Sequence, residues 1–446
     1  MNSILQLKGR FEQRSNRSRP GSPKLPKGKS VSASHLRELE KQLERILVYW
    51  TENKDIRGAL VSVHYKHIVA KSNRLKILLS ENGKSPTESI RGAKFVWEPD
   101  QKGNEVQKHV FTHFVSLQAI EKSIDVLKKT ASIIEQYYKG SVSSEVIEEL
   151  GEKYHFNEVP KTSFLKTVVD GFYVERFDID RATEEITEEA IITIYQTGVD
   201  TKRLLSKFGI DIVDDRIIDG TTLRLNPDEV KLLYNNASYL IAMGVTDFSE
   251  ISRDDVLDAY EDMEEEAGLL IPHPQNEPVI GVIDTQFNEK VYFHEWVEYK
   301  NLLDPNIPLS RKDYEHGTAV SYIIVDGPQG NPELADGCGR FRVRHFGVAT
   351  NNGFSSFTVL KMIRNIVASN RDIKVWNLSL GSKLEIKPNF ISPEAAELDR
   401  IQSEYDVIFV VAGTNIPAGV TKKNMRIGSP ADSLNSMVVN AVDFAG

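Results

Sequence analysis

The chain has 446 residues, a formal net charge of −9 and a single cysteine, Cys338. This length suffices for two or three domains, each with its own hydrophobic core. Hydrophobic residues make up 40% and charged residues 27%, as in soluble globular proteins, and the acidic balance disfavours a general nucleic-acid binder. One cysteine excludes an intramolecular disulfide framework, and no apolar run approaches the ~20 residues of a membrane span or forms a signal-peptide core. We therefore expect a cytoplasmic protein without a membrane anchor.

Residues 1–31 differ in composition from the rest of the chain. Within residues 1–30, eight Lys and Arg stand against Glu12 alone, among prolines, glycines and serines. Such a segment cannot bury enough apolar surface to offset the entropy lost on ordering, so we predict a disordered basic tail. Contact with nucleic acid or an acidic partner through this tail stays open as an alternative to simple solvation.

Residues 32–185 are predicted to form an α+β domain. Apolar residues recur at helical spacing from Leu36 to Trp50, with Ser34 as the expected N-cap. The histidines of this region lack the cysteine or carboxylate pattern of a metal site, so no metal is assigned. The role of the domain stays open, with a protein partner as one hypothesis. Strands are expected at Ala59–Tyr65, Lys94–Glu98 and Val110–Leu117, and a second helix at about 118–138.

Residues 186–248 are predicted to form a small βαββαβ module. Asn226 is a good N-cap and Pro227 suits the first helical position. This element order is the split-βαβ arrangement, and a generic α+β module is the alternative. The strands are expected at Ala190–Thr197, Ile210–Val213, Thr221–Leu225 and Tyr239–Val245, and the helices at Thr201–Phe208 and 227–235.

Residues 249–277 are predicted to form an acidic helix, at about 253–266, and a proline-stiffened linker. In residues 278–446, near-continuous β-branched runs alternate with helical patterns. This alternation predicts an α/β fold with a doubly wound, mostly parallel sheet and helices on both faces. Strands are expected at Val279–Ile283, Phe341–Val348, Ile373–Leu380, Val407–Val411 and Met437–Val442, and helices at about 317–325, 356–369 and 393–404.

Two polar residues of this α/β region have the pattern of an acid–base pair. Asp284 ends an apolar strand, where open α/β sheets place their ligand sites. His316 follows at the expected start of a helix, with the small residues Gly317 and Thr318 beside it. A hydrogen bond from the imidazole to a buried carboxylate would orient the ring and stabilise the imidazolium formed when histidine takes a serine proton.

In this order, Asp284-Thr285, His316-Gly317-Thr318 and Ser379-Leu380-Gly381 resemble the motifs of the subtilisin-like serine proteases, whose triad runs Asp, His, Ser along the chain. The resemblance covers about residues 278–446. It implies that Asp284 orients the histidine and that His316 is the general base.

The resemblance also implies a substrate-binding edge and an oxyanion site. An extended peptide would pair through main-chain hydrogen bonds with Ser379, Leu380 and Gly381 on one side. Asn352 and Gly353 would lie near its opposite side. Asn415 would donate its side-chain amide to the oxyanion, with Thr414 as the alternative residue at this place. A peptide or protein substrate is therefore expected, without a cofactor and without an assignable calcium site.

The chain departs from the family pattern in three places. Gln286 replaces the glycine that usually follows Asp-Thr, and Ala319-Val320 stand where a bulkier residue often precedes Val-Ala-Gly. The Gly-Thr-Ser segment that bears the family's nucleophile is expected beyond Gly446, because Ser429, before Pro430, is a poor substitute. Before the linker, 221–245 resembles the second half of a subtilase propeptide, which assists folding and plugs the active cleft.

Two classes of function remain open. The first is a serine endopeptidase that needs a Gly-Thr-Ser segment to be active. The second is a non-catalytic pseudo-protease or regulatory scaffold that binds a peptide or a partner. An in-frame Gly-Thr-Ser in the DNA beyond codon 446 distinguishes the two classes.

Overall fold

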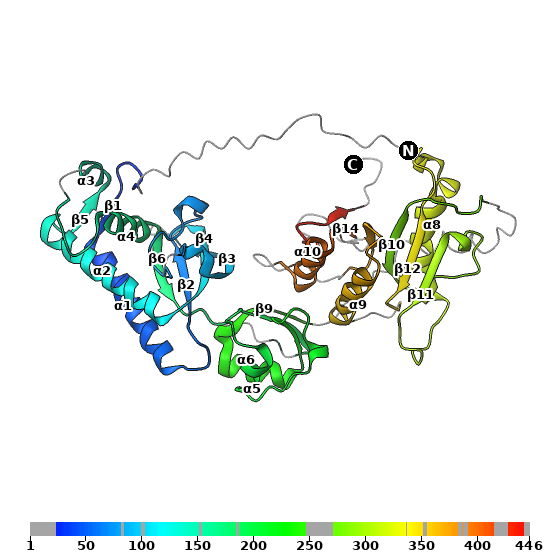
Figure 1. Ribbon diagram of the computed structural model, residues 1–446, viewed down its shortest axis with the longest axis horizontal. Coiled ribbons are helices and arrows are strands. Elements are labelled where there is room, and N and C mark those ends of the chain that lie inside the picture. Colours follow the sequence, from blue (N-terminus) through cyan, green and yellow to red (C-terminus); the bar gives the residue numbers. More distant parts are fainter. Residues whose placement is uncertain are drawn as a thin grey trace. The chain divides into compact units, whose positions relative to one another are not determined.

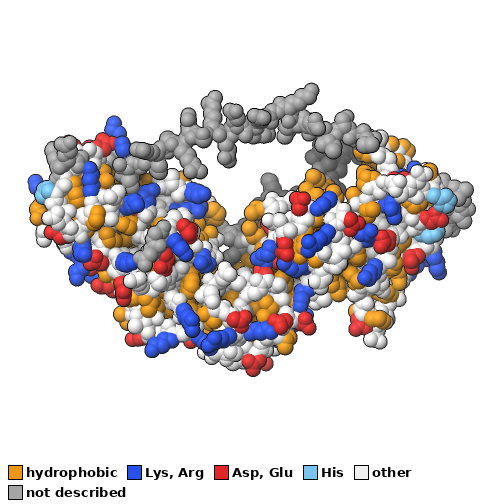
Figure 2. Space-filling model, in the orientation of Figure 1, with side chains coloured by type: hydrophobic (Ala, Val, Ile, Leu, Met, Phe, Trp, Pro, Cys, Tyr) orange, Lys and Arg blue, Asp and Glu red, His pale blue; other side chains and the backbone are white. Residues whose placement is uncertain are grey.

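A computed structural model describes residues 24–81, 84–99, 103–150, 154–183, 186, 188–246, 271–335, 337–350, 355–381, 386, 391–413 and 427–440. The chain divides into an N-terminal unit that ends at Gly244 and a C-terminal unit that begins at Val245. On the face shown in Figure 2, acidic and basic side chains are interspersed over both units. No helix of the described ranges is long and apolar enough to cross a membrane.

The N-terminal unit contains a four-stranded antiparallel sheet in the order β3-β4-β2-β6 (Figure 1). Leu36, Leu39 and Leu43 of α1 are fully buried, as their helical spacing predicts, and α1 packs against α2. The strands are β2 (Ala59–Tyr65), β3 (Ile90–Pro99), β4 (Glu105–Val115) and β6 (Val174–Asp178), and the helices α1 (Ala33–Glu52), α2 (Leu117–Tyr137), α3 (Ser144–Glu149) and α4 (Lys161–Tyr173).

Ordered structure begins earlier than the predicted tail allows. Strand β1 (Ser30–Ser32) pairs antiparallel with β5 (Ser141–Ser143), and Val31 is buried. The prediction of a tail through residue 31 is therefore wrong for 24–31, while residues 1–23 lie outside the described ranges. The N-cap of α1 is Ser32 rather than Ser34, because the helix starts at Ala33 and the Ser32 hydroxyl accepts a hydrogen bond from His35 N at 3.2 Å.

The βαββαβ prediction is wrong in one strand. The sheet has three strands in the order β8-β7-β9. Ile210 and Ile212 are buried, but 210–213 has no ladder partner and runs into the 3-10 turn Asp214–Arg216. Alternating burial in an irregular segment thus imitates a strand. The elements are β7 (Ala190–Ile194), α5 (Thr201–Ser206), β8 (Thr222–Leu225), α6 (Pro227–Ala237) and β9 (Ile241–Thr246).

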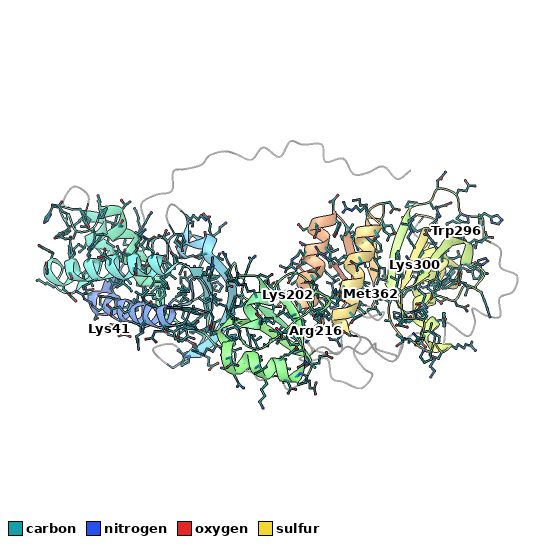
Figure 3. All side chains as sticks on the ribbon, turned by 60° about the horizontal axis from the view of Figure 1, so that its bottom comes forward. Lys41, Lys202, Arg216, Trp296, Lys300 and Met362 are labelled. Atoms are coloured by element: carbon teal, nitrogen blue, oxygen red, sulfur yellow. The ribbon has the colours of Figure 1, made fainter. Side chains whose placement is uncertain are left out.

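The small module that contains β7, α5, β8, α6 and β9 packs against the rest of the N-terminal unit. Asn226 caps α6 in a capping box with Glu229, as its position predicts, and Glu229 also pairs with Arg216, a residue labelled in Figure 3. The Tyr239 ring packs edge-on against Trp50 of α1, with 5.1 Å between ring centroids. Module and α+β domain therefore share one hydrophobic core.

The C-terminal unit contains the predicted parallel sheet. Its order is β11-β12-β10-β13-β14-β15, and every neighbouring pair is parallel. The strands are β10 (Val279–Asp284), β11 (Val297–Asn301), β12 (Arg342–Gly347), β13 (Val375–Leu378), β14 (Ile408–Ala412) and β15 (Met437–Val439). The described helices are α8 (Lys312–Gly330), α9 (Ser356–Ser369) and α10 (Pro393–Tyr405). The predicted acidic helix lies outside the described ranges.

Helices cover both faces of the C-terminal sheet. Val282 packs with Val325 of α8 in one apolar cluster. Its neighbour in sequence, Ile283, points to the opposite face and is in register with Leu378. Leu378 lines a small cavity with Leu360 of α9. The doubly wound arrangement is therefore confirmed.

Two features of this unit differ from the sequence-based expectation. Strand β11 was not predicted, because charged residues such as Lys300 (Figure 3) interrupt the apolar pattern of this edge strand. Helix α8 begins at Lys312, so His316 lies in its second turn and not at the helix start.

Candidate active site

Asp284 and His316 meet at the carboxyl edge of the parallel sheet. Asp284 ends β10, and the Nδ1 of His316 lies 2.6 Å from Asp284 Oδ1. The aspartate side chain is fully buried, whereas the histidine side chain is 22% exposed. Within the described ranges the other ring nitrogen, Nε2, has no hydrogen-bond partner. Nε2 is therefore free to accept a proton from a group that enters from solvent.

Electrostatics favours the charged form of both partners. Burial on its own raises the pKa of the Asp284 carboxyl, but the attraction and hydrogen bond of His316 outweigh burial, and the net result is a lowered pKa. The same attraction raises the pKa of His316 above 6.5, although burial opposes it. Asp284 Oδ2 is buried without a hydrogen-bond partner among the described residues, so Oδ1 makes the contacts of this carboxylate.

Thr285, the residue after the aspartate, joins it to the helix of the histidine. Its backbone N–H donates to Asp284 Oδ1 at 2.7 Å, and its Oγ1 accepts from Gly317 N at 2.9 Å. Gly317 is the residue after His316, and a Cβ there would lie 2.8 Å from Thr285 O. The glycine is therefore required by the close approach of the two backbones.

Gln286, at the position of the family's glycine, makes a buried network of its own. Its Nε2 donates to Ala349 O at 3.0 Å, and its Oε1 accepts from the Tyr299 hydroxyl at 2.7 Å. These bonds connect the end of β10 to residues of β11 and of the segment after β12. A Cβ at Gly347 would overlap Gln286 Oε1. The larger residue after Asp-Thr is thus matched by a glycine on the neighbouring strand.

Part of the chain matches a known protein family. Residues 275–446 match the subtilase family, and the matched segment includes Asp284, His316 and Ser379–Gly381. This part of the chain belongs to the subtilase family. No curated protein matches the chain.

Three solved structures are among those to which this chain is similar. The prenylagaramide maturation protease PagA is 15% identical over 43% of this chain and 61% of its own, with a TM-score of 0.28. The epidermin leader peptide processing serine protease EpiP from Staphylococcus aureus is 17% identical over 56% and 69%, with a TM-score of 0.32. The psychrophilic subtilisin-like protease Apa1 from Pseudoalteromonas sp. AS-11 is 16% identical over 36% and 35%, with a TM-score of 0.26. The chain thus spans less than two thirds of the length of PagA and of Apa1.

The predicted peptide-binding residues of the subtilase domain are partly described. Ser379, Leu380 and Gly381 follow β13, which pairs in parallel with β10, so they leave the sheet at the same edge as Asp284. The Ser379 hydroxyl donates to Asn377 Oδ1 at 2.9 Å, and Leu380 is buried. The roles of these residues stay predictions. Asn352, Gly353 and Asn415 lie outside the described ranges.

Ser429 is engaged away from the dyad. Its hydroxyl lies 2.9 Å from Ser392 Oγ and 3.0 Å from the carboxylate of Glu394, and it makes no hydrogen bond to His316. The hydrogen bonds of Ser429 therefore do not join it to the acid–base pair of Asp284 and His316. In the ranges that the structure describes, no group of three His, Cys, Asp or Glu could hold a metal ion.

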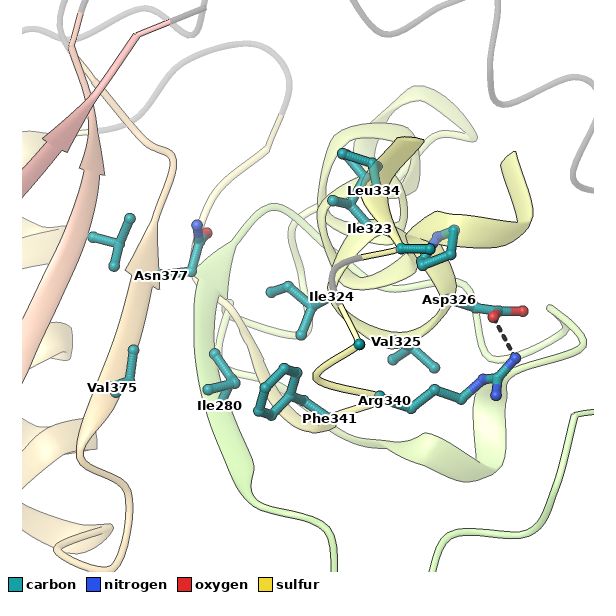
Figure 4. A pocket seen from close by; sticks show the side chains of 15 residues that line it. Ile280, Ile323, Ile324, Val325, Asp326, Leu334, Arg340, Phe341, Val375 and Asn377 are labelled. Carbon is teal, nitrogen blue, oxygen red and sulfur yellow. Dashed lines mark hydrogen bonds and ion pairs between the residues drawn. The ribbon is translucent and has the colours of Figure 1, made fainter. Parts of the chain in front are cut away.

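An apolar groove of about 580 Å³ lies beside α8 on the face of the subtilase sheet (Figure 4). Ile280 and Val375 line it from the strands, and Ile324 lines it from the helix. Asp326 and Arg340 form an ion pair at 2.6 Å on one side of it. Neither residue of the dyad lines the groove, so the groove and the acid–base pair are separate features.

Two buried polar residues beside the dyad were not predicted as part of the site. Gln286 was noted only as a departure from the family. The sequence patterns assign no role to His345, although it is fully buried and hydrogen-bonded to Thr285 O. A polar residue at an inward position of an apolar strand is the signal that points to such a network.

Proposed function

We propose that the subtilase domain is a serine endopeptidase. The observation that carries the proposal is the 2.6 Å contact between buried Asp284 and His316, with Nε2 of His316 unpartnered. In the proposed reaction Nε2 takes the proton of a serine hydroxyl as its oxygen attacks the scissile carbonyl. The same nitrogen then returns the proton to the leaving amine, and Asp284 holds the ring in the tautomer with hydrogen on Nδ1.

The nucleophile in this proposal is the serine of a Gly-Thr-Ser segment encoded beyond residue 446. The engagement of Ser429 by Ser392 and Glu394 supports this assignment, because it leaves Ser429 unavailable to His316.

The substrate in this proposal is an extended peptide. It pairs through its main chain with Ser379–Gly381 on one side and lies near Asn352 and Gly353 on the other. Asn415 donates to the oxyanion, a type of contact whose removal lowers kcat by about 10²–10³-fold in such proteases.

The test is acylation by a fluorophosphonate probe. The protein is expressed from DNA that includes the codons after residue 446 and is then incubated with the probe. Mass spectrometry locates the acylated residue. We expect label on the serine of a Gly-Thr-Ser segment and loss of label in His316→Ala. His294→Ala, a histidine of the same domain outside the dyad, is the matched control and keeps the label. A stop codon directly after codon 446, or equal labelling of both variants, would contradict the proposal.

Two further parts of the proposal concern regulation and location. We propose that 186–248 acts like a subtilase propeptide and restrains the peptidase domain, and that the protein is cytoplasmic. A protease site engineered into the linker at 249–277 tests the first part, because cleavage there should raise the labelling rate. An unchanged rate after complete cleavage would reject the propeptide role. Cell fractionation tests the second part.

A further inference from the structure

His345 connects the two elements that carry the dyad. It lies on β12 and is fully buried. Its Nδ1 is 2.9 Å from the hydroxyl of Ser321, which belongs to α8. Its Nε2 is 2.8 Å from the carbonyl oxygen of Thr285, the residue after Asp284. The imidazole of His345 thus connects the Asp284–Thr285 turn to α8, the helix that carries His316.

These two contacts define the tautomer of the His345 ring. A carbonyl oxygen only accepts, so Nε2 carries the hydrogen and donates to Thr285. Nδ1 then has a lone pair and accepts from the Ser321 hydroxyl. Burial lowers the pKa of His345, which keeps the ring neutral and agrees with this arrangement.

Packing holds the His345 ring in place. A Cβ at Gly317 would lie 2.8 Å from its Cε1, so the ring sits directly against the residue after His316. The rings of Phe287 and Tyr299 lie against it as well, each with 5.7 Å between centroids. The imidazole therefore cannot turn without displacing either α8 or the segment after β10.

Hydrogen bonds on both sides of the Thr285 backbone connect His345 to the dyad. His345 donates to the carbonyl of Thr285, whose own N–H donates to Asp284 Oδ1 at 2.7 Å. The same oxygen lies 2.6 Å from Nδ1 of His316. We propose that His345 is a positioning residue: it holds the Asp284–Thr285 turn against α8 and so keeps the dyad at hydrogen-bonding distance. The catalytic consequence rests on the proposed function, whereas the geometry does not.

Proton NMR of the 446-residue chain, with ¹⁵N-labelled histidine, tests this role. The Nδ1–H of a carboxylate-bound imidazole gives a low-field resonance, which is assigned to His316 by its loss in His316→Ala. His345→Phe keeps an aromatic ring but removes both hydrogen bonds. We expect the resonance to broaden or vanish and the pKa of His316 to fall by about one pH unit, because a less fixed carboxylate stabilises the imidazolium less. In His345→Gln the amide nitrogen reaches the place of Nε2, so both signals should recover.

His113→Phe is the matched control, because His113 is also a buried strand histidine with Nδ1 2.9 Å from a serine hydroxyl, that of Ser89, in the N-terminal unit. It should leave the His316 signals unchanged. A folded His345→Phe protein with an unchanged resonance and an unchanged His316 pKa would overturn the proposal. If His345→Phe does not fold, His345→Asn replaces it, since its shorter amide does not reach Thr285. Equal His316 pKa values in His345→Asn and His345→Gln would then overturn the proposal.

These readouts need no serine nucleophile. Loss of the His316 resonance in His345→Phe, together with no fluorophosphonate labelling of the protein expressed with the codons after residue 446, would support the positioning role and reject the endopeptidase. Labelling that depends on His316 but is insensitive to His345→Phe would do the reverse.

Discussion

Among the described residues there are two histidine–aspartate pairs, one in each unit, and of these two the C-terminal pair has the geometry of a catalytic dyad. In the N-terminal unit, Nε2 of His64 lies 3.0 Å from Asp180 Oδ1. In the C-terminal unit, Nδ1 of His316 lies 2.6 Å from Asp284 Oδ1. Residue types and distance are similar in the two pairs, so the difference lies in their surroundings.

The two pairs differ in the burial of the histidine and in the ion-pair partners of the aspartate. The His64 side chain is only 5% exposed and its second nitrogen is buried, whereas the His316 side chain is 22% exposed. Asp180 also binds Lys94 at 2.8 Å, so its charge is shared with a permanent cation. Asp284 has His316 as its ion-pair partner among the described residues. A dyad for proton transfer therefore needs an accessible second nitrogen and an aspartate that is not already neutralised.

The largest effect expected from this comparison concerns the two aspartates. In protein that carries the proposed serine, Asp284→Asn should lower the rate of fluorophosphonate labelling by about 10⁴-fold, because the ring loses its catalytic tautomer. Asp180→Asn should leave the rate unchanged. The measurement is the time course of labelling at a single pH. Comparable losses in both variants would erase the distinction between the pairs.

The next effect concerns the polar network that surrounds only the C-terminal pair. Gly347→Ala should destabilise the subtilase domain by about 1–3 kcal/mol, because the new methyl group overlaps Gln286 Oε1. Urea unfolding, followed by hydrogen–deuterium exchange in each unit, measures the loss. Gly381→Ala is the matched control, since its Cβ would meet only Ser429 O at 3.7 Å. In a Gln286→Gly background, Gly347→Ala should cost little, and an undiminished cost there would show that the network does not explain the glycine.

The two units should also respond differently to pH. The pKa of His316 is raised in the folded state, so its contribution to the free energy of unfolding is full below about 6.5 and is lost as pH rises through the folded pKa. The pKa of Asp284 is lowered, so its contribution is lost only as pH falls through its folded pKa. Between the folded pKa values of Asp284 and His316 the ion pair stabilises the C-terminal unit. Asp284→Asn should remove this stabilisation.

In the N-terminal unit, burial lowers the pKa of His113 to about 3. The unfolded chain binds this proton more readily than the folded unit, so stability should fall as pH drops from about 6.5 toward 3. Hydrogen–deuterium exchange as a function of pH separates the two units. His113→Phe should flatten the acid response of the N-terminal unit alone, and an unchanged slope would contradict this assignment.

The smallest effect tests the local chemistry of the N-terminal unit. Ser32→Ala should cost about 1 kcal/mol, because the helix loses its N-cap acceptor for His35 N. Ser34→Ala should cost much less, since Ser34 lies inside the helix. Thermal unfolding of the two variants decides between the caps, and equal shifts in Tm would contradict the assignment of Ser32.

Whether a feature can be predicted from the sequence depends on how far apart along the chain its interacting residues lie. Helix α9 has the bounds expected from its pattern, and the dyad was expected because the strand end at Asp284 and the His316-Gly317-Thr318 motif are local features. Strand Ile210–Val213 was wrong because burial, which the pattern reports, does not require a ladder partner. The contacts of Gln286 with Tyr299 and of Thr285 with His345 join residues 13 and 60 positions apart, and no local pattern encodes such pairs.

The most direct test of the dyad is peptide hydrolysis by the serine-containing protein, with the two histidines exchanged for alanine in parallel. His316→Ala should lower kcat by about 10⁶-fold at an unchanged fold, the loss seen when the triad histidine of subtilisin is removed, while His64→Ala should retain the kcat of the unaltered protein. A folded His316→Ala protein with a kcat close to that of the unaltered protein would contradict the account.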